Sequence, residues 1–500
     1  MTTIDAAPPA PLATRRLSVE EILLLAVVVY FVGLRVLVTG FAPPFLDEPY
    51  YWLWGRHPAL SYYDHPPLQG WIQWLSYSLF GRNTFALRWP TWVALAVEMW
   101  IFYRVARRLS GDQWRVVFLR SAAVFLASPI MGFFMGLAFL DYLLIALVMA
   151  SGYLFLEFLS EVEEGRRGRT ATLFGAAVLL GLAVLTKYNG ALLGIAVAGT
   201  VLIRPKLRPL LLDWRLWAAA AVAIGMQAPV FIWNWQHGFE SFLYQGGSRH
   251  GTTGFTGFDF DRMKVALANG LIMASPFIVP VIIRFFWGKQ SQPYERVGKT
   301  LALWLFWPST LLLLFIANFS WIMVWWNGIA YVMFFPFAGR YTRPILLGVH
   351  IAYGLVINTF TSITYSIVPV LLLFGAAPGM ETESMYGWPK IAERVMELKA
   401  EHGADFIAMN YAQNASELAW ELDNPDVFAI TSQRNTFDDW SDPTPHLGKS
   451  AIFLEQVPAG DEWRASFGKV TKLEDVPAQV WGYTVRTYVV YLAEDFRGLQ

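Results

Sequence analysis

Residues 45–71 read FLDEPYYWLWGRHPALSYYDHPPLQGW and directly follow the first long apolar run of the chain. Carboxylates and imidazoles stand here among Tyr and Trp residues: Asp47, Glu48, His57, Asp64 and His65. The pairs Pro43-Pro44 and Pro66-Pro67 bound the stretch, and proline resists one continuous helix. We therefore expect a shaped polar loop where the preceding run leaves a bilayer, and such a loop is typical of a functional site.

The composition points to a membrane protein. Hydrophobic residues make up 55% of the chain and the mean hydropathy is +0.40, which is too apolar for a soluble chain of 500 residues. The formal net charge is zero, so no basic surplus favours a nucleic-acid partner. The sequence contains no cysteine, which excludes disulfides and thiol chemistry.

Clusters of Lys and Arg divide the apolar runs into pairs, at 104–115, 166–169, 204–215, 284–299 and 340–343. Cytoplasmic loops are enriched in Lys and Arg, so we place these clusters and the N-terminus inside. Residues 1–18 then form a disordered cytoplasmic tail, and residues 19–378 form a transmembrane domain with its first outer loop at 42–85. We expect about 11–13 transmembrane helices, with spans near 20–41, 86–104, 116–132, 137–158, 171–187, 190–203, 216–235, 263–286, 300–317, 326–339 and 345–374.

Residues 379–500 have a different composition and predict a small extracytoplasmic α/β domain. An amphipathic helix is expected over 390–403, and a second over 415–422 with Asn414 as its cap. Strands are expected over 406–409, 427–430, 451–454 and 483–492. The fold class is therefore a mainly α polytopic membrane protein with a small C-terminal α/β domain.

Several outward-facing polar residues could carry chemistry. Asp47-Glu48 would supply a general base just outside the membrane, the alternative being a solvated pair or a helix cap. Asp64-His65 could meet a phosphate or help to bind a metal. Asp141 lies near the outer end of an apolar span, where a carboxylate is costly and usually functional, although it could instead pair with Arg88.

Cations and a polar loop accompany these carboxylates on the same side. Lys187 with Tyr188 could face an anionic leaving group, or Lys187 could only extend its ammonium to the interface. The loop at 233–251 carries His237, Glu240, Arg249 and His250, and its glycines predict a flexible lid. We interpret Trp321, Trp325 and Trp326 as an interface belt. A donor delivered within the membrane, with a phosphate at the interface, would fit this arrangement.

The sequence resembles the family 39-like GT-C glycosyltransferases, and within them the ArnT-like bacterial branch. The resemblance covers most of the chain and is carried by these elements: Asp47-Glu48-x-Tyr50-Tyr51-Trp52, Tyr63-Asp64-His65-Pro66-Pro67-Leu68, Asp141, Leu185-Thr186-Lys187-Tyr188, Trp233-Asn234-x-Gln236-His237-Gly238, Ala415-Ser416-Glu417-Leu418-Ala419 and Asp438-x-Trp440. Aminoarabinose transferases have Glu-Lys where this chain has Asp64-His65, and an arginine near Pro49-Tyr50, so an aminoarabinose donor does not follow.

The resemblance implies roles for these residues in an inverting transfer of sugar from a polyprenyl phosphate. It implies Asp47, Glu48 and Asp141 as catalytic residues, with the base being either Asp47 or Glu48. Phosphate binding falls to His65, Lys187, Tyr188 and Arg249, and substrate binding to Tyr50, Tyr51, Asp64, His237 and Glu240. No cofactor is required for a monophosphate leaving group, although Asp64 and His237 leave a divalent metal open.

The expected function is thus a monomeric glycosyltransferase of a bacterial inner membrane, with its active site and C-terminal domain facing the periplasm. Its acceptor would be lipid A, the lipopolysaccharide core or another envelope glycolipid. A polysaccharide or protein acceptor, sugar loading onto polyprenyl phosphate, and a lipid-linked-sugar transporter are the alternatives. A transporter would need polar groups through the full depth of the membrane.

Overall fold

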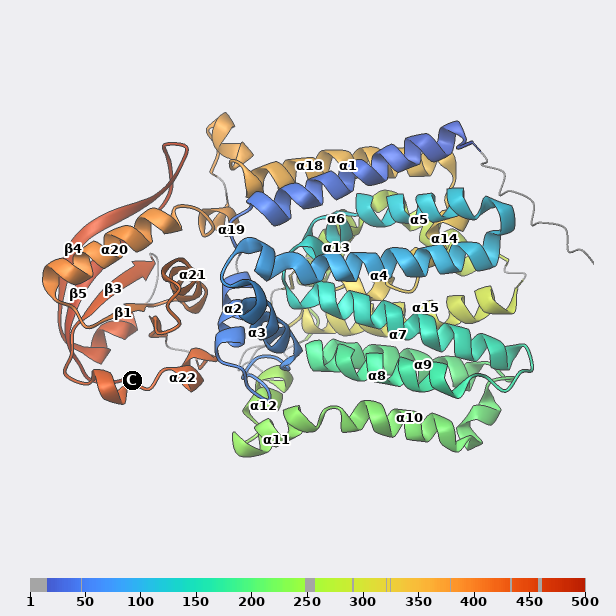
Figure 1. The fold of residues 1–500 in the computed structure, drawn as a ribbon, viewed down its shortest axis with the longest axis horizontal. Helices are drawn as coiled ribbons and strands as arrows, with labels where there is room; N and C mark the ends of the chain where they lie inside the picture. Colours follow the sequence, from blue (N-terminus) through green and yellow to red (C-terminus); the bar gives the residue numbers. More distant parts are fainter. Residues whose placement is uncertain are drawn as a thin grey trace, which may run out of the picture.

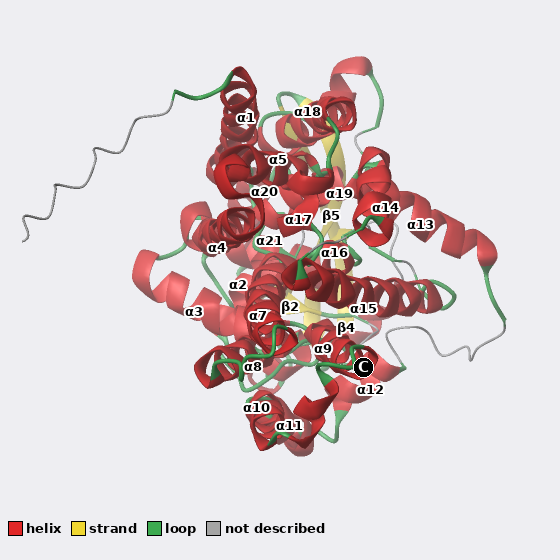
Figure 2. Ribbon diagram, turned by 90° about the vertical axis from the view of Figure 1, so that its right-hand side faces the viewer, coloured by secondary structure: helices red, strands yellow, loops and turns green. Residues whose placement is uncertain are grey.

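The computed structural model describes residues 16–45, 47–247, 257–289, 292–320, 322–323, 325–377, 379–431, 434–456 and 461–499. The chain forms a bundle of roughly parallel helices, and a smaller α/β domain covers one end of this bundle (Figure 1). Figure 2 shows the bundle end on, with the strands of the C-terminal domain behind it. The chain is therefore mainly helical with a small sheet domain, as the sequence predicts.

Four helices are each long and apolar enough to cross a membrane: α1 (Val19–Phe41), α7 (Leu140–Glu163), α15 (Pro293–Ile316) and α18 (Pro344–Ser366). Counting each bent helix pair as one span gives up to seven among the described residues. α1 begins at a capping box, in which the Ser18 hydroxyl accepts from the Glu21 amide and the Glu21 carboxylate accepts from the Ser18 amide. These helices confirm a multi-pass membrane protein, and the total of about 11–13 spans stays a prediction.

The other helices of the bundle are shorter, bent or broken. They are α4 (Thr84–Ser110), α5 (Trp114–Ala127), α6 (Pro129–Gly132), α8 (Thr170–Thr186), α9 (Ala191–Ile203), α10 (Trp214–Gly225), α11 (Ala228–Gln236), α13 (Phe260–Ala274), α14 (Val279–Trp287), α16 (Gly328–Tyr331) and α17 (Phe335–Tyr341). The predicted span at 326–339 was wrong as one continuous helix, because it divides into α16 and α17. Pro336 stands at the start of α17, where its missing amide is tolerated.

Three short helices lie between the bundle and the C-terminal domain: α2 (Glu48–Arg56), α3 (Leu68–Phe80) and α12 (Glu240–Gly246) (Figure 1). The first outer loop is thus partly helical, and Pro49 and Pro67 stand at the starts of its helices. α2 packs closely on α3, because a Cβ at Gly55 would lie 2.6 Å from the Trp74 backbone nitrogen. Aromatic residues of α2 also contact the C-terminal domain, since the ring centroids of Trp52 and Trp420 lie 5.3 Å apart.

The C-terminal domain has a sheet of five strands in the order β2-β1-β3-β5-β4. The strands are β1 (Phe406–Met409), β2 (Phe428–Ala429), β3 (Ala451–Gln456), β4 (Phe467–Val480) and β5 (Tyr483–Phe496). β1 is parallel to β2 and β3, while β5 is antiparallel to β3 and β4. The four predicted strands are confirmed, whereas β4 was not predicted.

The helices of this domain are α19 (Met380–Glu383), α20 (Trp388–His402), α21 (Ala412–Leu422) and α22 (Phe437–Trp440). α20 ends as predicted at Gly403, which has a left-handed conformation with φ of 63°. The predicted cap at Asn414 was wrong, because α21 starts earlier and Tyr411 precedes it. The Asn414 side chain instead donates to the side chain of Gln456, the last residue of β3.

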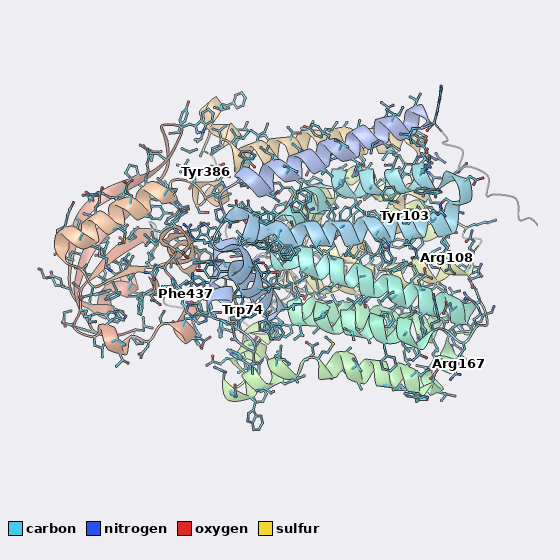
Figure 3. The ribbon with its side chains drawn as sticks, in the orientation of Figure 1. Trp74, Tyr103, Arg108, Arg167, Tyr386 and Phe437 are labelled. Atoms are coloured by element: carbon cyan, nitrogen blue, oxygen red, sulfur yellow. The ribbon has the colours of Figure 1, made fainter. Side chains whose placement is uncertain are left out.

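The basic loops and the C-terminal domain lie at opposite ends of the bundle. Figure 3 places Arg108 and Arg167 at the end remote from this domain, while Trp74 lies beside it and Phe437 belongs to it. This separation agrees with the charge asymmetry on which the predicted topology rests. The assignment of the basic end to the cytoplasm stays a prediction.

Candidate active site

A cavity of about 330 Å³ lies where the outer loop, the bundle and the C-terminal domain meet. Three aspartates line it, Asp47, Asp64 and Asp141, and Glu417 of the C-terminal domain adds a fourth carboxyl group. Cationic or titratable nitrogen groups line it as well, on His65, Lys187 and Arg486. The structure thus brings together acids and bases that come from distant parts of the sequence.

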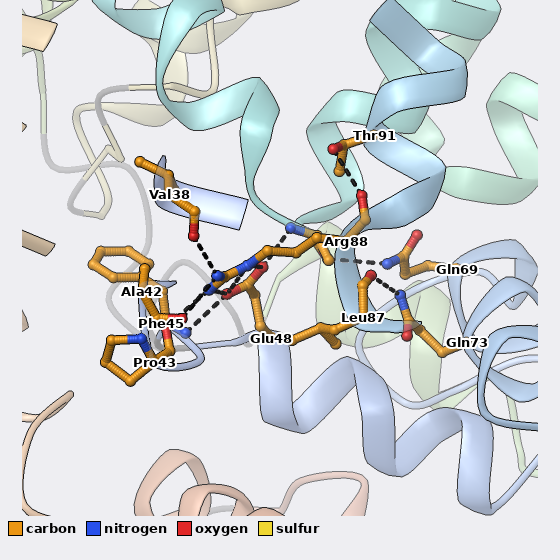
Figure 4. Close-up of polar contacts among 11 residues, drawn as sticks. Val38, Ala42, Pro43, Phe45, Glu48, Gln69, Gln73, Leu87, Arg88 and Thr91 are labelled. Carbon is orange, nitrogen blue, oxygen red and sulfur yellow. Dashed lines mark hydrogen bonds and ion pairs between the residues drawn. The ribbon is translucent and has the colours of Figure 1, made fainter. Parts of the chain in front are cut away.

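The neighbours Asp47 and Glu48 have different surroundings. Asp47 directly precedes α2 and lines the cavity. Glu48 is fully buried, and its carboxylate accepts from the amides of Phe45 at 2.9 Å and Ala138 at 2.6 Å. The same carboxylate pairs with the Arg88 guanidinium at 2.5 Å (Figure 4). Glu48 does not line the cavity, and this geometry argues against its predicted catalytic role.

Arg88 completes this buried network. Its guanidinium donates to the carbonyl oxygens of Val38, Ala42 and Pro43 at 2.8, 2.9 and 2.8 Å (Figure 4). The network therefore joins the end of α1 to α4 and to the segment that precedes α7. A buried ion pair requires such additional hydrogen bonds, because each charge loses its hydration. Since Asp47 stands next to Glu48, the network also holds Asp47 at the cavity wall.

Asp141 forms an ion pair with Lys187 and not with Arg88. The Lys187 ammonium lies 2.9 and 3.2 Å from the two carboxylate oxygens of Asp141. Asp141 belongs to the first turn of α7, and Lys187 directly follows α8. Both side chains are buried and line the cavity, and the Trp326 ring centroid lies 5.8 Å from the ammonium. The ammonium is thus positioned by a carboxylate within the cavity.

Asp64 connects the outer loop to the C-terminal domain. Its carboxylate accepts from the Tyr50 hydroxyl at 3.0 Å and from the Thr436 hydroxyl at 3.1 Å. Its backbone carbonyl accepts from the side chain of Gln245 in α12. The adjacent His65 is buried and lines the cavity. Asp64 therefore holds the cavity wall together while His65 faces the space inside.

The Tyr51 phenol lies close enough to Asp47, Asp64 and Asp141 for all three charges to affect its pKa. Burial raises the pKa of its phenol well above the usual value, and the negative charges of Asp47, Asp64 and Asp141 raise this pKa further. One buried phenol thus stays neutral beside three acids. Tyr50 lies next to it in α2, with their ring centroids 6.0 Å apart. These two tyrosines, predicted to bind substrate, line the cavity.

A second cavity of about 230 Å³ adjoins the first, because His65, Lys187 and Trp326 line both. Its other walls are mainly apolar and come from α9, α15 and α16: Leu192, Leu312, Leu313, Ile316 and Ile329. Tyr188 also lines it and forms a hydrogen bond of 3.0 Å with the Ser241 hydroxyl. The pair of cavities thus offers a polar chamber and an apolar one, with His65 and Lys187 at their boundary.

The predicted residues of the loop at 233–251 lie elsewhere. The His237 ring stacks on Trp233 at 4.0 Å, and its Nδ1 lies 2.8 Å from the Trp233 carbonyl oxygen. Glu240 accepts from Arg434 of the C-terminal domain at 3.0 Å. Neither side chain lines the cavity, so the expected substrate contacts are not seen. Arg249 and the lid glycines at 251 and 254 lie outside the described residues.

No group of three or more His, Asp or Glu side chains is placed to hold a metal ion in the part of the chain that the structure describes. Asp64 and His237, which left a metal open, contribute to no such group. Asp64 instead accepts from two hydroxyls, and one His237 nitrogen faces a carbonyl oxygen.

Several cavity residues were missed by sequence reasoning. Trp325 and Trp326, interpreted as an interface belt, line the cavity, and Trp325 stacks on Phe134 at 4.9 Å. Trp321 lies outside the described residues. The C-terminal domain contributes Tyr411, Gln413, Asn414, Glu417, Gln456 and Arg486. Glu417 belongs to a motif that carries the resemblance and Asn414 was predicted as a helix cap, but neither was assigned to the site, because only the docking of the domain brings these residues to the cavity.

The chain matches known proteins in sequence. Residues 64–233 match the family model described as dolichyl-phosphate-mannose-protein mannosyltransferase. The chain is 26% identical over 175 residues to the lipopolysaccharide core galacturonosyltransferase RgtB of Rhizobium johnstonii, covering 35% of this chain and 34% of the relative. It is 26% identical over 222 residues to RgtA of that organism, covering 44% and 42%. The matches thus span less than half the length of either relative.

The fold is shared more completely. The crystal structure of apo ArnT from Cupriavidus metallidurans has a TM-score of 0.63 at 13% identity, covering 95% of this chain and 98% of that chain. The structure of the same protein bound to undecaprenyl phosphate has a TM-score of 0.62 at 15% identity, covering 94% and 97%. The expected resemblance is confirmed: the chain has the GT-C fold of ArnT and carries, within residues 64–233, the sequence pattern of the mannosyltransferase family model.

Proposed function

We propose that the protein transfers a sugar from a polyprenyl-phosphate donor to an extracytoplasmic glycolipid such as lipid A or the lipopolysaccharide core. The observation that carries this proposal is the boundary between the two cavities. His65 and Lys187 stand there, with an apolar chamber on one side and three carboxylates on the other. A prenyl chain, a phosphate and a sugar would meet these surroundings in that order.

The polar chamber, which Asp47, Asp64 and Asp141 line, supports a single displacement with inversion at the anomeric carbon. Asp47 lines the cavity at the start of α2 and would take the proton of the acceptor hydroxyl as its oxygen attacks the anomeric carbon. The bond between that carbon and the phosphate oxygen breaks, and the polyprenyl phosphate leaves with the electron pair. We assign Asp47 and not Glu48 to this step, because Arg88 and two backbone amides already occupy the Glu48 carboxylate.

Cations at the boundary would stabilise the departing phosphate. Lys187 and His65 are the described candidates, and Asp141 would position Lys187 through their ion pair. Preorganised donors of this kind favour the transition state, because charge grows on the phosphate as the bond breaks. Asp141 would then act through Lys187. Tyr50 and Tyr51 would offer rings and hydroxyls to the sugars.

The relatives suggest which acceptors to test first. RgtA and RgtB are named for the lipopolysaccharide core, and one ArnT structure holds undecaprenyl phosphate. A glycolipid acceptor and an undecaprenyl-phosphate donor are therefore the first substrates to try. The family model's description favours a protein acceptor as the second candidate.

The test is transfer by purified protein in lipid nanodiscs, supplied with synthetic polyprenyl-phosphate sugars and either lipopolysaccharide or protein acceptors. We expect a glycosylated glycolipid, one polyprenyl phosphate released per transfer, and an inverted anomeric centre by NMR. Asp47→Asn should lower turnover by about 10²- to 10⁴-fold, the contribution of a general base. Equal transfer by both proteins would remove Asp47 as the base, and no transfer from any donor would refute the function.

Mass spectrometry of envelope glycolipids from a deletion strain gives an independent test. We expect one glycolipid to lose a sugar and to regain it when the wild-type gene is restored. An unchanged glycolipid profile, together with a lost protein glycoform, would favour the protein acceptor. The Asp47→Asn gene should fail to restore the sugar although the protein is present in the membrane.

A further inference from the structure

The C-terminal domain contributes its own charged wall to the cavity. Glu417 from α21 and Arg486 from β5 both line it, beside Tyr411 and Asn414. None of these residues belongs to the transfer step proposed above. A capping domain that served only as a cover would need no buried ionisable pair of residues at this place.

Glu417 is a buried carboxyl with unused hydrogen-bonding capacity. Glu417 is only 3% exposed. Its buried Oε1 atom has no hydrogen-bond partner among the described residues. Burial raises its pKa well above the usual value, and the charges of Glu421 and Glu48 raise the pKa further. A carboxyl held neutral in this way can donate its proton to an acceptor.

Arg486 is a largely buried cation that forms an ion pair with Glu383. The exposed fraction of its side chain is 10%, and its guanidinium lies 3.4 Å from the carboxylate of Glu383. This is a long contact, and the Glu383 side chain is 26% exposed. A guanidinium has five N–H donors in a planar fork that matches the two oxygens of a carboxylate. The contacts to Glu383 and to the nearby Tyr488 phenol use only part of this fork, which leaves donors for a ligand.

We propose that Arg486 and Glu417 bind a carboxylate carried by one of the two sugars that meet in the cavity, either the transferred sugar or the accepting one. This inference rests on the proposed function. A neutral sugar would not compensate the lost hydration of the Arg486 guanidinium, whereas a carboxylate supplies the opposite charge. The neutral Glu417 carboxyl would donate a second hydrogen bond to the same group. The donor phosphate already has His65 and Lys187 at the other boundary of the cavity.

The experiment compares matched substrates. Donors are polyprenyl phosphates that carry a uronic acid or the neutral hexose of the same stereochemistry. Acceptors are the same lipopolysaccharide with its sugar carboxylates intact or reduced to alcohols. We expect Arg486→Gln to lower kcat/KM by about 10- to 100-fold only for combinations that contain the recognised carboxylate. A loss confined to the uronic acid donor assigns the carboxylate to the transferred sugar, and a loss confined to the intact acceptor assigns it to the accepting sugar.

Matched variants separate recognition from folding. Glu417→Gln keeps a donor of the same shape and should change kcat/KM by no more than about threefold, whereas Glu417→Leu should lower it about tenfold for the carboxylate substrate. Arg497→Gln repeats the charge change at an exposed residue and should behave as wild type. Equal losses for all four substrate combinations, or none, would overturn the inference and leave the proposed function standing. No transfer by the wild type from any donor would refute both.

Discussion

Two neighbouring clusters of charged residues have different surroundings in this protein. In the first, Glu48 and Arg88 are both fully buried and use their oxygens and nitrogens on each other and on backbone groups. In the second, Asp47, Asp141 and Lys187 line a cavity. Asp47 and Glu48 are adjacent in the sequence, yet they belong to different clusters. Satisfied charges hold a structure together, whereas charges that face a cavity remain able to meet a ligand.

The largest expected effect concerns the buried ion pair of Glu48 and Arg88. Arg88→Met should leave the Glu48 carboxylate buried without its cation and lower the free energy of unfolding by about 3–5 kcal/mol. Glu48→Leu should be similarly damaging, while the double variant should recover only part of the loss, because it removes both buried charges but leaves their backbone partners without hydrogen bonds. Thermal unfolding in detergent, with Asp47→Asn as the comparison, measures this difference.

Two outcomes would contradict the view that Glu48 and Arg88 stabilise the fold while Asp47 does not. The single variants could be as stable as wild type, or Asp47→Asn could be as unstable as Arg88→Met. Asp47 is only half-buried and lines the cavity, so removing its charge should cost stability little. We expect Asp47→Asn to change the free energy of unfolding by no more than an ordinary surface substitution does, about 0.5 kcal/mol.

The next effect concerns Lys187, the cation among the charged residues that line the cavity. Lys187→Met should lower transfer by about 10²- to 10³-fold, the loss typical of removing one group that stabilises developing negative charge. Asp141→Asn should act in the same direction but less strongly, because the ammonium stays and only its position is relaxed. Single-turnover transfer measures both variants. Lys472→Met, an exposed change in β4, is the matched control.

Equal activity of Lys187→Met and wild type would show that Lys187 is only an interface lysine. A loss in Asp141→Asn that exceeds the loss in Lys187→Met would also contradict the proposed order of action. It would return Asp141 to a direct role in the reaction.

A smaller effect is expected at the contact between the two domains. Thr436→Val removes the hydroxyl that donates to the Asp64 carboxylate at 3.1 Å. One such hydrogen bond contributes about 1 kcal/mol, so we expect transfer to fall about fivefold. Thr471→Val, at an exposed position of β4, should have no effect on the same assay. Greater losses in the control would show that the variants disturb the domain itself.

The smallest effect is a dependence of stability on pH. The pKa of Glu417 is raised by burial, with Glu421 and Glu48 raising it further and Arg88 opposing them. Its contribution to stability is fully present below the ordinary value of 4.5 and is lost as pH rises toward the pKa of the folded protein. The unfolding temperature of the wild type should therefore fall over this range more steeply than that of Glu417→Gln. Parallel curves would contradict this assignment.

Local sequence was a good guide where a pattern is repeated or bounded. The strand at 406–409 and the helix that ends at Gly403 were predicted because apolar spacing and a helix-ending glycine are local signals. β4 was missed because its sequence, FGKVTKLEDVPAQV, is polar and contains Pro477. It lies at the edge of the sheet, where a proline is tolerated and one face can meet water.

The candidate site was predictable only in part. Asp47, Asp64, His65, Asp141 and Lys187 were selected because a carboxylate or cation near a membrane surface is costly and rarely incidental. His237 and Glu240 were selected for the same reason, yet they stack on Trp233 and contact Arg434 instead. Residue type and membrane depth indicate that a polar group has a partner. They do not indicate which partner it has.

The sequence by itself determined that this protein crosses a membrane many times, that its polar and aromatic residues collect in one outer loop, and that a separate α/β domain follows. Composition and periodicity decide these properties along the chain. Only the tertiary structure decided that Glu48 turns to Arg88 while Asp47 faces a cavity, and that Glu417 and Arg486 complete its wall. The physical reason is that adjacent residues of a helix project in different directions, so burial and pairing depend on elements that lie far away in the sequence.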